Sequence, residues 1–240
     1  MKNKVLVVLL VGLNSAVCCA GSSAPTPGSE APLILRGDGQ FAAEKAIDAI
    51  SSYTEAIRLN PNSSEAYWKR ARANLHVRKQ EQGLEDAAQS VRLNPKSADA
   101  YHWRGAAYRM AGKYEEAISD LDKALELNPK SCLTFNLRGT VYRQMKKYNE
   151  AIRDYTEALR LEPNRTNTYL NRALAYRYKR DYDKAISDLT ELIRLAPANA
   201  TAYTQRSKLY RAKGDLEQAD KDLQQAQRLE EKVPEKQESP

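Results

Sequence analysis

One pattern of 34 residues is repeated at Ala98–Ser131 (ADAYHWRGAAYRMAGKYEEAISDLDKALELNPKS) and again at Cys132–Arg165 (CLTFNLRGTVYRQMKKYNEAIRDYTEALRLEPNR). Its most regular mark is a proline, which recurs at the same interval along the chain. These prolines are Pro61, Pro95, Pro129, Pro163 and Pro197. Self-similarity at one fixed period is typical of solenoids, in which each unit packs mainly on its neighbours. The period therefore predicts a repeat architecture before any single helix is considered.

Each unit contains two faces with helical spacing. We number the units so that the proline is position 32, and they then begin at Ser64, Ala98, Cys132, Thr166 and Ala200. An aromatic residue recurs at position 4, a small residue at 8 and mostly Tyr at 11, whereas small or apolar residues dominate positions 20, 24 and 27. Both sets of spacings predict one face of an α-helix. Gly or Lys near position 15 indicates the turn between the two helices. The small residues let the helices approach closely.

This pattern closely resembles the tetratricopeptide repeat, in which an aromatic residue, Leu, Gly and Tyr on the first helix are followed by Ala, an aromatic residue, Ala and Pro. The resemblance covers Ser64 to about Lys232 and recurs five times in register. It implies an all-α fold, a right-handed α-solenoid of about five helix-turn-helix units. It also implies that the protein binds other proteins or peptides. One departure is systematic, because position 7, where the family commonly has Leu, is always Arg.

Each arginine at position 7 has a matching aspartate at position 23 of the same unit. Facing positions of an antiparallel helix pair have a constant sum, and 7 with 23 agrees with the pairs 4 with 27 and 8 with 24. We therefore expect the two residues to meet across the hairpin and to fix its register, contributing about 0.2–1 kcal/mol per pair if exposed. A ligand-binding role for the arginines is the alternative. The expected pairs are Arg70 with Asp86, Arg104 with Asp120, Arg138 with Asp154, Arg172 with Asp188, and Arg206 with Asp222.

The two ends of the array differ from its inner units. In the last unit Asp220 and Gln227 replace apolar residues, which predicts a polar face that ends the array. Upstream, Leu33 and Arg36-Gly37 match the first-helix pattern but Pro32, Asp38 and Gly39 interrupt it, so we expect a degenerate opening unit with a regular second helix. The expected segments are an export signal (1–20), a flexible spacer with a degenerate first helix (21–41), an opening helix (42–63), full units at 64–97, 98–131, 132–165 and 166–199, a terminal unit (200–233) and a disordered tail (234–240).

The amino-terminal residues have the composition of an export signal. Lys2 and Lys4 precede an apolar run, Val5 to Leu13, and small or polar residues follow. This run is shorter than the roughly 20 residues that a membrane span needs. Cleavage after Ala20 is favoured, whereas acylation of Cys18 or Cys19 and an uncleaved anchor are the alternatives. The expected location is therefore the periplasm, the exterior or the cell envelope.

Composition gives little support to catalysis. After removal of the signal only Cys132 surely remains, and His76 and His102 are too few for a metal cluster. No phosphate loop or catalytic triad is evident, so we expect no enzyme activity, no cofactor, no metal and no small-molecule substrate. The net charge is +7 with both signs mixed along the chain, which allows acidic partners without indicating nucleic acid. The tyrosines occupy packing positions, apart from Tyr178, so stacking on bases is not indicated.

Positions 2, 5, 9, 12 and 13 of the first helix are not needed for packing. In tetratricopeptide repeat proteins this stripe lines a concave groove that holds an extended peptide or a partner helix. Here position 12 is Arg in four successive units, position 9 adds two further cations, position 5 adds an aromatic end, and two polar residues lie between them. The candidate groove residues are Trp68, Arg72, His102, Arg109, Asn136, Thr140, Arg143, Arg177, Lys208 and Arg211.

Arginine forks at this stripe favour an acidic segment or a terminal carboxylate as the ligand. A solvated charged face is the alternative. The chaperone-tail clamp of this family is not expected, because no unit has Lys at position 5. We expect an exported scaffold that binds an acidic protein segment. The other hypotheses are a binder of an anionic polymer or lipid surface, with affinity that falls steeply with salt, and an accessory subunit of a separate enzyme. Membrane contact is expected only through a lipidated or uncleaved amino terminus.

Overall fold

The computed structural model describes residues 29–231, and within this range the chain forms twelve α-helices without any strand. Each odd-numbered helix pairs with the helix that follows it. The helices are α1 (Ala31–Ala42), α2 (Ala46–Leu59), α3 (Ser64–His76), α4 (Gln80–Leu93), α5 (Ala98–Met110), α6 (Tyr114–Leu127), α7 (Cys132–Gln144), α8 (Tyr148–Leu161), α9 (Thr166–Tyr178), α10 (Tyr182–Leu195), α11 (Ala200–Lys213) and α12 (Leu216–Glu231). The expected all-α repeat solenoid is confirmed. The predicted export signal, with Cys18 and Cys19, and the predicted tail lie outside the described residues.

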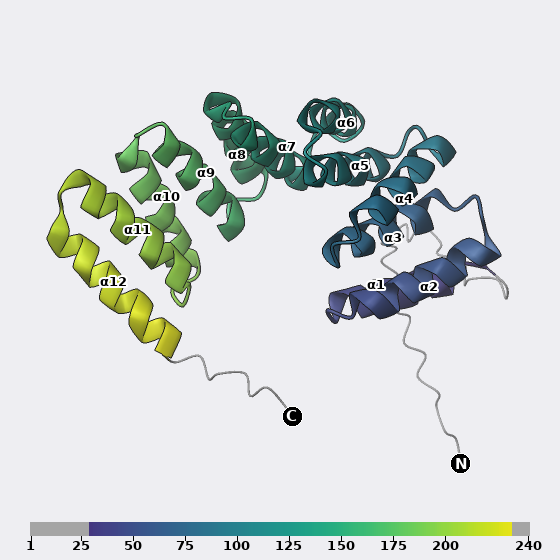
Figure 1. Ribbon diagram of the computed structural model, residues 1–240, viewed down its shortest axis with the longest axis horizontal. Coiled ribbons are helices and arrows are strands. Elements are labelled where there is room, and N and C mark those ends of the chain that lie inside the picture. Colours follow the sequence, from purple (N-terminus) through teal and green to yellow (C-terminus); the bar gives the residue numbers. More distant parts are fainter. Residues whose placement is uncertain (1–28, 232–240) are drawn as a thin grey trace, which may run out of the picture.

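Successive hairpins stack into an arch that rises from α1 and α2, passes through α6, α7 and α8, and descends to α12 (Figure 1). The first helices of neighbouring hairpins contact one another, α3 with α5, α5 with α7, and α7 with α9. Figure 1 places α6 on the outer side of α5. The odd-numbered helices therefore line the inner side of the arch, which we call the concave face. None of the helices in residues 29–231 has both the length and the apolar character that crossing a membrane requires.

The two helices of a hairpin approach closely where position 8 is small. A Cβ atom added to Gly139 would lie 2.9 Å from Cε1 of Tyr155 and 3.1 Å from the carbonyl oxygen of Ala151. Tyr155 itself is fully buried. The missing side chain of Gly139 thus makes room for the ring at position 24, and the same exchange of volume occurs where Gly105 faces Leu121.

The helix boundaries recur because their capping residues recur. The side chains of Ser63, Ser97 and Ser131 each accept a hydrogen bond from the backbone N–H three residues further on, which satisfies one donor of the first helix. At the other end of the unit, the residue before each proline leaves the helical conformation, as Asn60 does with φ −133° and ψ 92°. Proline disfavours helical geometry in the residue that precedes it. A proline therefore ends each unit, and a capping side chain begins most of them, with Asn199 in place of serine in the last unit and no side-chain cap at Arg165.

The turn inside every described hairpin places position 15 in the left-handed region. This residue is Gly112 or Gly214 in two units, with φ of +74° and +86°. In the other units it carries a side chain, and Lys146 has φ of +61°. A left-handed conformation costs an L-residue with a side chain roughly 1–2 kcal/mol relative to its usual conformations. These turns are therefore locally strained.

Replacing Lys146 with Gly is expected to raise the free energy of unfolding by about 0.5–1 kcal/mol, because the relief of strain exceeds the extra entropy that glycine gives the unfolded chain. Lys147→Gly is the matched control, since Lys147 has φ of −84° and gains nothing from glycine. Urea unfolding of the three proteins measures the difference. A Lys146→Gly variant no more stable than Lys147→Gly would contradict this explanation of the turn.

The first helix of the opening unit is a regular α-helix, where the sequence predicted a degenerate one within a flexible spacer. Helix α1 spans Ala31–Ala42 and contains all three of the residues expected to interrupt it. Pro32 lies in the first turn, where its missing N–H would have no partner within the helix. Gly39 meets nothing within 4 Å of an added Cβ atom, so it lies at an open position of the helix. Residues 31–41 are consequently part of the array and not of a spacer.

Tertiary contacts explain why α1 is stable despite its composition. Gly37 is at position 8 of the opening unit, and a Cβ atom there would lie only 2.5 Å from Cε1 of Tyr53. Asp38 accepts hydrogen bonds from the hydroxyl of Tyr53 (2.7 Å) and from Nζ of Lys69 (2.5 Å). Packing and ion pairing at these positions outweigh the weak helix propensity of the two residues. Asp38 therefore ties the opening hairpin to the first helix of the next unit.

Candidate functional site

All five arginines at position 7 contact the aspartate at position 23 of their own unit. Arg138 donates from Nε and Nη2 to the two carboxylate oxygens of Asp154, at 2.8 and 2.7 Å. The aspartates at this position are buried, and Asp154 is 6% exposed. The same two-point geometry joins Arg70 with Asp86, Arg104 with Asp120, Arg172 with Asp188, and Arg206 with Asp222. These ion pairs are therefore not the exposed kind, which contributes little to stability.

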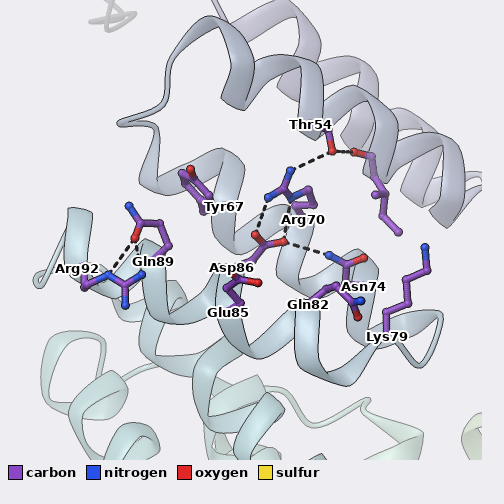
Figure 2. A pocket seen from close by; sticks show the side chains of 11 residues that line it. Thr54, Tyr67, Arg70, Asn74, Lys79, Gln82, Glu85, Asp86, Gln89 and Arg92 are labelled. Carbon is purple, nitrogen blue, oxygen red and sulfur yellow. Dashed lines mark hydrogen bonds and ion pairs between the residues drawn. The ribbon is translucent and has the colours of Figure 1, made fainter.

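The same arginine also reaches the preceding unit, a contact that the sequence analysis missed. Arg138 donates from Nη1 to Asp122 at 2.6 Å. Figure 2 shows the equivalent contact of Arg70 with Thr54, at 3.1 Å. Arg172 and Arg206 contact Thr156 and Thr190 in the same way. These acceptors all stand at position 25, where a recurring Thr or Asp was the signal that could have revealed the contact.

The contacts through which each of these arginines joins three helices contribute strongly to stability because they are buried. The hydrogen bonds that Arg104 donates to Asp120 raise the pKa of the Arg104 guanidinium, although burial opposes them. Burial raises the pKa of Asp154, against the opposing hydrogen bonds of Arg138. A buried carboxylate whose partner is removed is left with a large desolvation penalty. The arginines at position 7 therefore hold the array together and are not available to a ligand.

A cavity of about 650 Å³ lies on the outer side of the array between α2, α3 and α4, with Arg70 and Asp86 among its lining residues (Figure 2). A second cavity of about 600 Å³ occupies the equivalent place between α6, α7 and α8, around Arg138 and Asp154. Because corresponding positions of different units line both, these cavities follow from the stacking of repeats. Neither is a distinctive feature of one unit, so the concave face is the better candidate.

The four arginines at position 12 do not form one uniform ladder. Arg177 donates to the side-chain oxygen of Gln205 at 3.1 Å, and Arg211 forms an exposed ion pair with Asp220 at 3.0 Å. By contrast, Nε of Arg109 and of Arg143 is buried and has no hydrogen-bond partner in the described part of the chain. Neither of these two residues forms an ion pair within residues 29–231. Arg109 and Arg143, which we call the central arginines, are thus the two arginines of this ladder whose buried Nε atoms have no acceptor in the described residues.

The amino-terminal end of the expected stripe is neutralised by the opening unit. Arg72 contacts Asp38 at 3.4 Å and the hydroxyl of Tyr53 at 3.3 Å, and its guanidinium stacks 4.1 Å from the ring of Phe41. Trp68 is half-buried beside it, with its ring 5.8 Å from the Arg72 guanidinium. At the opposite end Lys208 is exposed. Arg72 is consequently a structural contact and not an available cation.

The polar residues at the middle of the concave face contact one another across units. His102 shares a hydrogen bond of 2.9 Å with Thr134, and burial lowers its pKa to about 4, so it is neutral near pH 7. The side-chain oxygen of Asn136 accepts from the hydroxyl of Thr168 at 3.2 Å. Thr140 donates to the carbonyl of Asn136 at 2.8 Å. The contacts of His102 with Thr134 and of Asn136 with Thr168 therefore join successive first helices, whereas the contact of Thr140 lies within α7.

Burial also lowers the pKa of the Arg109 guanidinium, and the neighbouring charges of Arg143 and Arg78 act in the same direction. The residue remains protonated, since arginine is charged at every physiological pH. The lowered pKa means that Arg109 is held in surroundings that disfavour its charge. An added anion would improve those surroundings.

The concave face also contains an apolar pocket that the sequence analysis did not predict. Its volume is about 340 Å³, and it joins the end of α1 with α3, α5 and α7. Arg109, His102 and Asn136 stand among its lining residues. Its large apolar residues are Phe41, Leu75, Trp103, Met110, Leu133 and Leu137. Trp103 and Leu137 are at position 6, which was not counted in the candidate stripe.

Sequence profiles of the tetratricopeptide repeat match residues 34–81, 98–131, 133–165, 167–199 and 200–233, which is more than half of the chain. The chain therefore belongs to the tetratricopeptide repeat family, and the resemblance noted in the sequence is confirmed. The first match begins inside α1, in accord with a helical opening unit. Members of this family are typically non-catalytic scaffolds for protein–protein interaction.

Solved structures similar to this chain share its fold at low sequence identity. One is the hetero-tetramer Cut9-Hcn1 of the APC/C (TM-score 0.76, 20% identity). The match covers 86% of this chain and 41% of the chain in that structure. The chain thus spans less than half the length of that relative. Another is pilF of Pseudomonas aeruginosa (TM-score 0.72, 22% identity, 83% and 91% covered). A third is YrrB, described as a TPR protein with an unusual peptide-binding site (TM-score 0.60, 23% identity, 75% and 93% covered). No curated protein matched the chain.

Proposed function

We propose that this protein is a non-catalytic scaffold that binds an acidic segment of a partner protein on its concave face. The proposal rests on the burial of the Nε atoms of the central arginines and on their lack of an ion pair in the described residues. Arg109 and Arg143 lie on the first helices of adjacent units, their Nε atoms are buried, and no carboxylate pairs with them within residues 29–231. A guanidinium binds a carboxylate through two parallel hydrogen bonds. An acidic segment would therefore supply the acceptors that the described part of the chain does not.

The test is capture of partners by two matched double variants of the protein. Arg109→Ala with Arg143→Ala removes the central arginines, whereas Arg177→Ala with Arg211→Ala removes the two arginines of the same ladder that Gln205 and Asp220 already engage. Each partner should be quantified after purification of the native protein and of each variant. We expect the first variant to lose at least about tenfold in bound partner, since buried charged contacts dominate such interfaces.

The control variant is expected to retain its partner to within about twofold, because its arginines make exposed or locally satisfied contacts. Circular dichroism should confirm that both variants fold. A partner retained by the first variant would place the interface elsewhere on the molecule. Equal losses in both variants would favour a general positive surface over a specific pair.

Salt dependence separates this function from binding to an anionic polymer or lipid surface. Such binding would weaken by roughly one unit of log affinity per log unit of salt for each phosphate contact. The pairing of Arg72 with Asp38 and of Arg211 with Asp220 shortens, at both ends, the positive stripe that a polymer would follow. We therefore expect a shallow salt dependence that corresponds to two charges.

We further propose that the protein acts outside the cytoplasm, on the composition of residues 1–20 alone. The mass of the mature chain tests this. We expect a chain that begins at Gly21, whereas a lipid-modified cysteine at its start would favour envelope anchoring. An intact Met1 in fully mature protein would contradict cleavage.

A further inference from the structure

The apolar pocket on the concave face is not required by the repeat. Its wall includes Leu133 at position 2 and two large side chains, Trp103 and Leu137, at position 6. In the fourth and fifth units the same two positions carry Asn167 and Thr201, and Asn171 and Gln205. Those units form the same helical hairpins with polar residues there. Trp103 and Leu137 pack in part on Leu75, Ala106 and Ala107, but the later units show that the hairpins form without large apolar groups at these positions.

Leu133 is the clearest sign that the pocket is incomplete. Its side chain is 50% exposed although it lies on the wall of a hollow, whereas the larger part of the apolar surface around it is half-buried. Half-exposed leucine at the rim of a pocket loses water when another apolar side chain enters. The volume of about 340 Å³ is enough to hold a bulky side chain.

Charge is distributed unevenly around this pocket, and that identifies the chemistry of its occupant. On the side of α3, the guanidinium of Arg72 is balanced by Asp38 and stacked on Phe41. On the other side Arg109 forms no ion pair within residues 29–231, and Arg143 stands at the same position of the next unit. An occupant with an apolar group and one adjoining negative charge would match both halves of the site.

We propose that the pocket receives a bulky apolar side chain, such as Leu, Phe or Trp, from a partner segment whose neighbouring carboxylate binds the central arginines. This inference rests on the proposed function and specifies its ligand. The partner segment would be anchored by apolar burial and oriented by the carboxylate, since the cations occupy only one side of the pocket. An acidic segment without an apolar anchor would bind weakly.

The experiment is selection of peptides from a phage-displayed library of random 12-residue sequences on the full-length native protein. Enriched peptides should be synthesised with a fluorescent label and measured by anisotropy. We expect them to combine a bulky apolar residue with a nearby Asp or Glu. Replacing either residue by Ala should weaken binding by about tenfold or more.

Two single variants test whether the pocket is the site. Leu133→Asp places a charge on the exposed rim and should weaken binding by about tenfold or more, because an apolar side chain would then be buried beside a charge. Leu216→Asp, at a leucine of α12 that is 58% exposed, is the matched control and should leave binding unchanged. Both substitutions are at exposed positions, and thermal unfolding verifies that each variant folds.

The outcomes distinguish this inference from the proposed function. Peptides that are acidic only, and whose binding falls with Arg109→Ala and Arg143→Ala but not with Leu133→Asp, would overturn the apolar anchor and leave the acidic site intact. Peptides that bind all of these variants equally would overturn both. If no peptide is enriched, the pocket inference fails, and the capture experiment alone decides the proposed function.

Discussion

Replacing Arg138 with Ala is expected to lower the free energy of unfolding by about 3 kcal/mol. Arg138 holds both carboxylate oxygens of the buried Asp154 and also binds Asp122 of the preceding unit. Removal of one partner from a buried ion pair costs about 3–5 kcal/mol, because the other charge stays in surroundings that disfavour it. We take the lower end of this range, since the arginine side chain is 19% exposed. Chemical denaturation of the full-length protein measures the change.

Two further variants show whether the cause is the unpaired charge. Arg138→Met combined with Asp154→Leu replaces the pair by apolar residues and should recover most of the lost stability, as is found for other buried pairs. Arg194→Ala removes an arginine whose ion pair with Glu191 is exposed, and it should change stability little. If the single variant Arg138→Ala were as stable as Arg194→Ala, the pair would be a surface contact and our explanation of the recurring Arg–Asp pairs would be wrong.

Replacing Tyr155 with Ala is expected to lower the free energy of unfolding by about 3–5 kcal/mol. The side chain is fully buried, and truncation of a large core residue leaves a cavity that the surrounding helices fill only in part. Its hydroxyl also loses a hydrogen bond of 3.2 Å to Thr140. The change in the denaturation midpoint, with an unchanged dependence on denaturant, would measure the effect.

The complementary variant at Gly139 tests the fit between the two helices. Gly139→Ala alone should cost about 1–3 kcal/mol, because the new methyl group would meet the ring of Tyr155. Combined with Tyr155→Leu, it reproduces the Ala173 and Leu189 pair of the next unit. We therefore expect the double variant to be more stable than the sum of the two single effects predicts. Strict additivity would mean that the two residues do not determine the spacing of the hairpin.

The fold was predictable because each of its rules is repeated. Proline, serine and small residues recur at fixed positions, so the pattern of any one unit can be compared with that of the four others. The opening unit was mispredicted because its helix depends on contacts outside itself. The missing side chain of Gly37 leaves room for the ring of Tyr53 in α2, and Asp38 is stabilised by Lys69 of the next unit. Helix propensity alone predicts that Gly37 and Asp38 disfavour a helix, and only their tertiary contacts explain why α1 forms.

The concave face was predicted less completely, for a related reason. The sequence gives the position of each arginine in its unit but not the acidic residue that comes close to it in space. Asp38 reaches Arg72 from the preceding hairpin, and Asp220 reaches Arg211 from the second helix of its own unit. The apolar pocket was missed because Trp103, Leu133 and Leu137 depart from the repeat in only two units. Departures of this kind are what distinguish one member of a repeat family from another.

Site-specific photo-crosslinking tests most directly whether a partner lies on the concave face. A benzophenone amino acid should be introduced at Gln144, an exposed residue of α7 that lines a cavity together with Arg109. The matched position is Lys123, which is exposed on α6 at the outer side of the arch. We predict that the partner is crosslinked through residue 144 and not through residue 123. Crosslinking through residue 123 alone would contradict the account, because the partner would then contact the outer helices and not the surface that contains the central arginines.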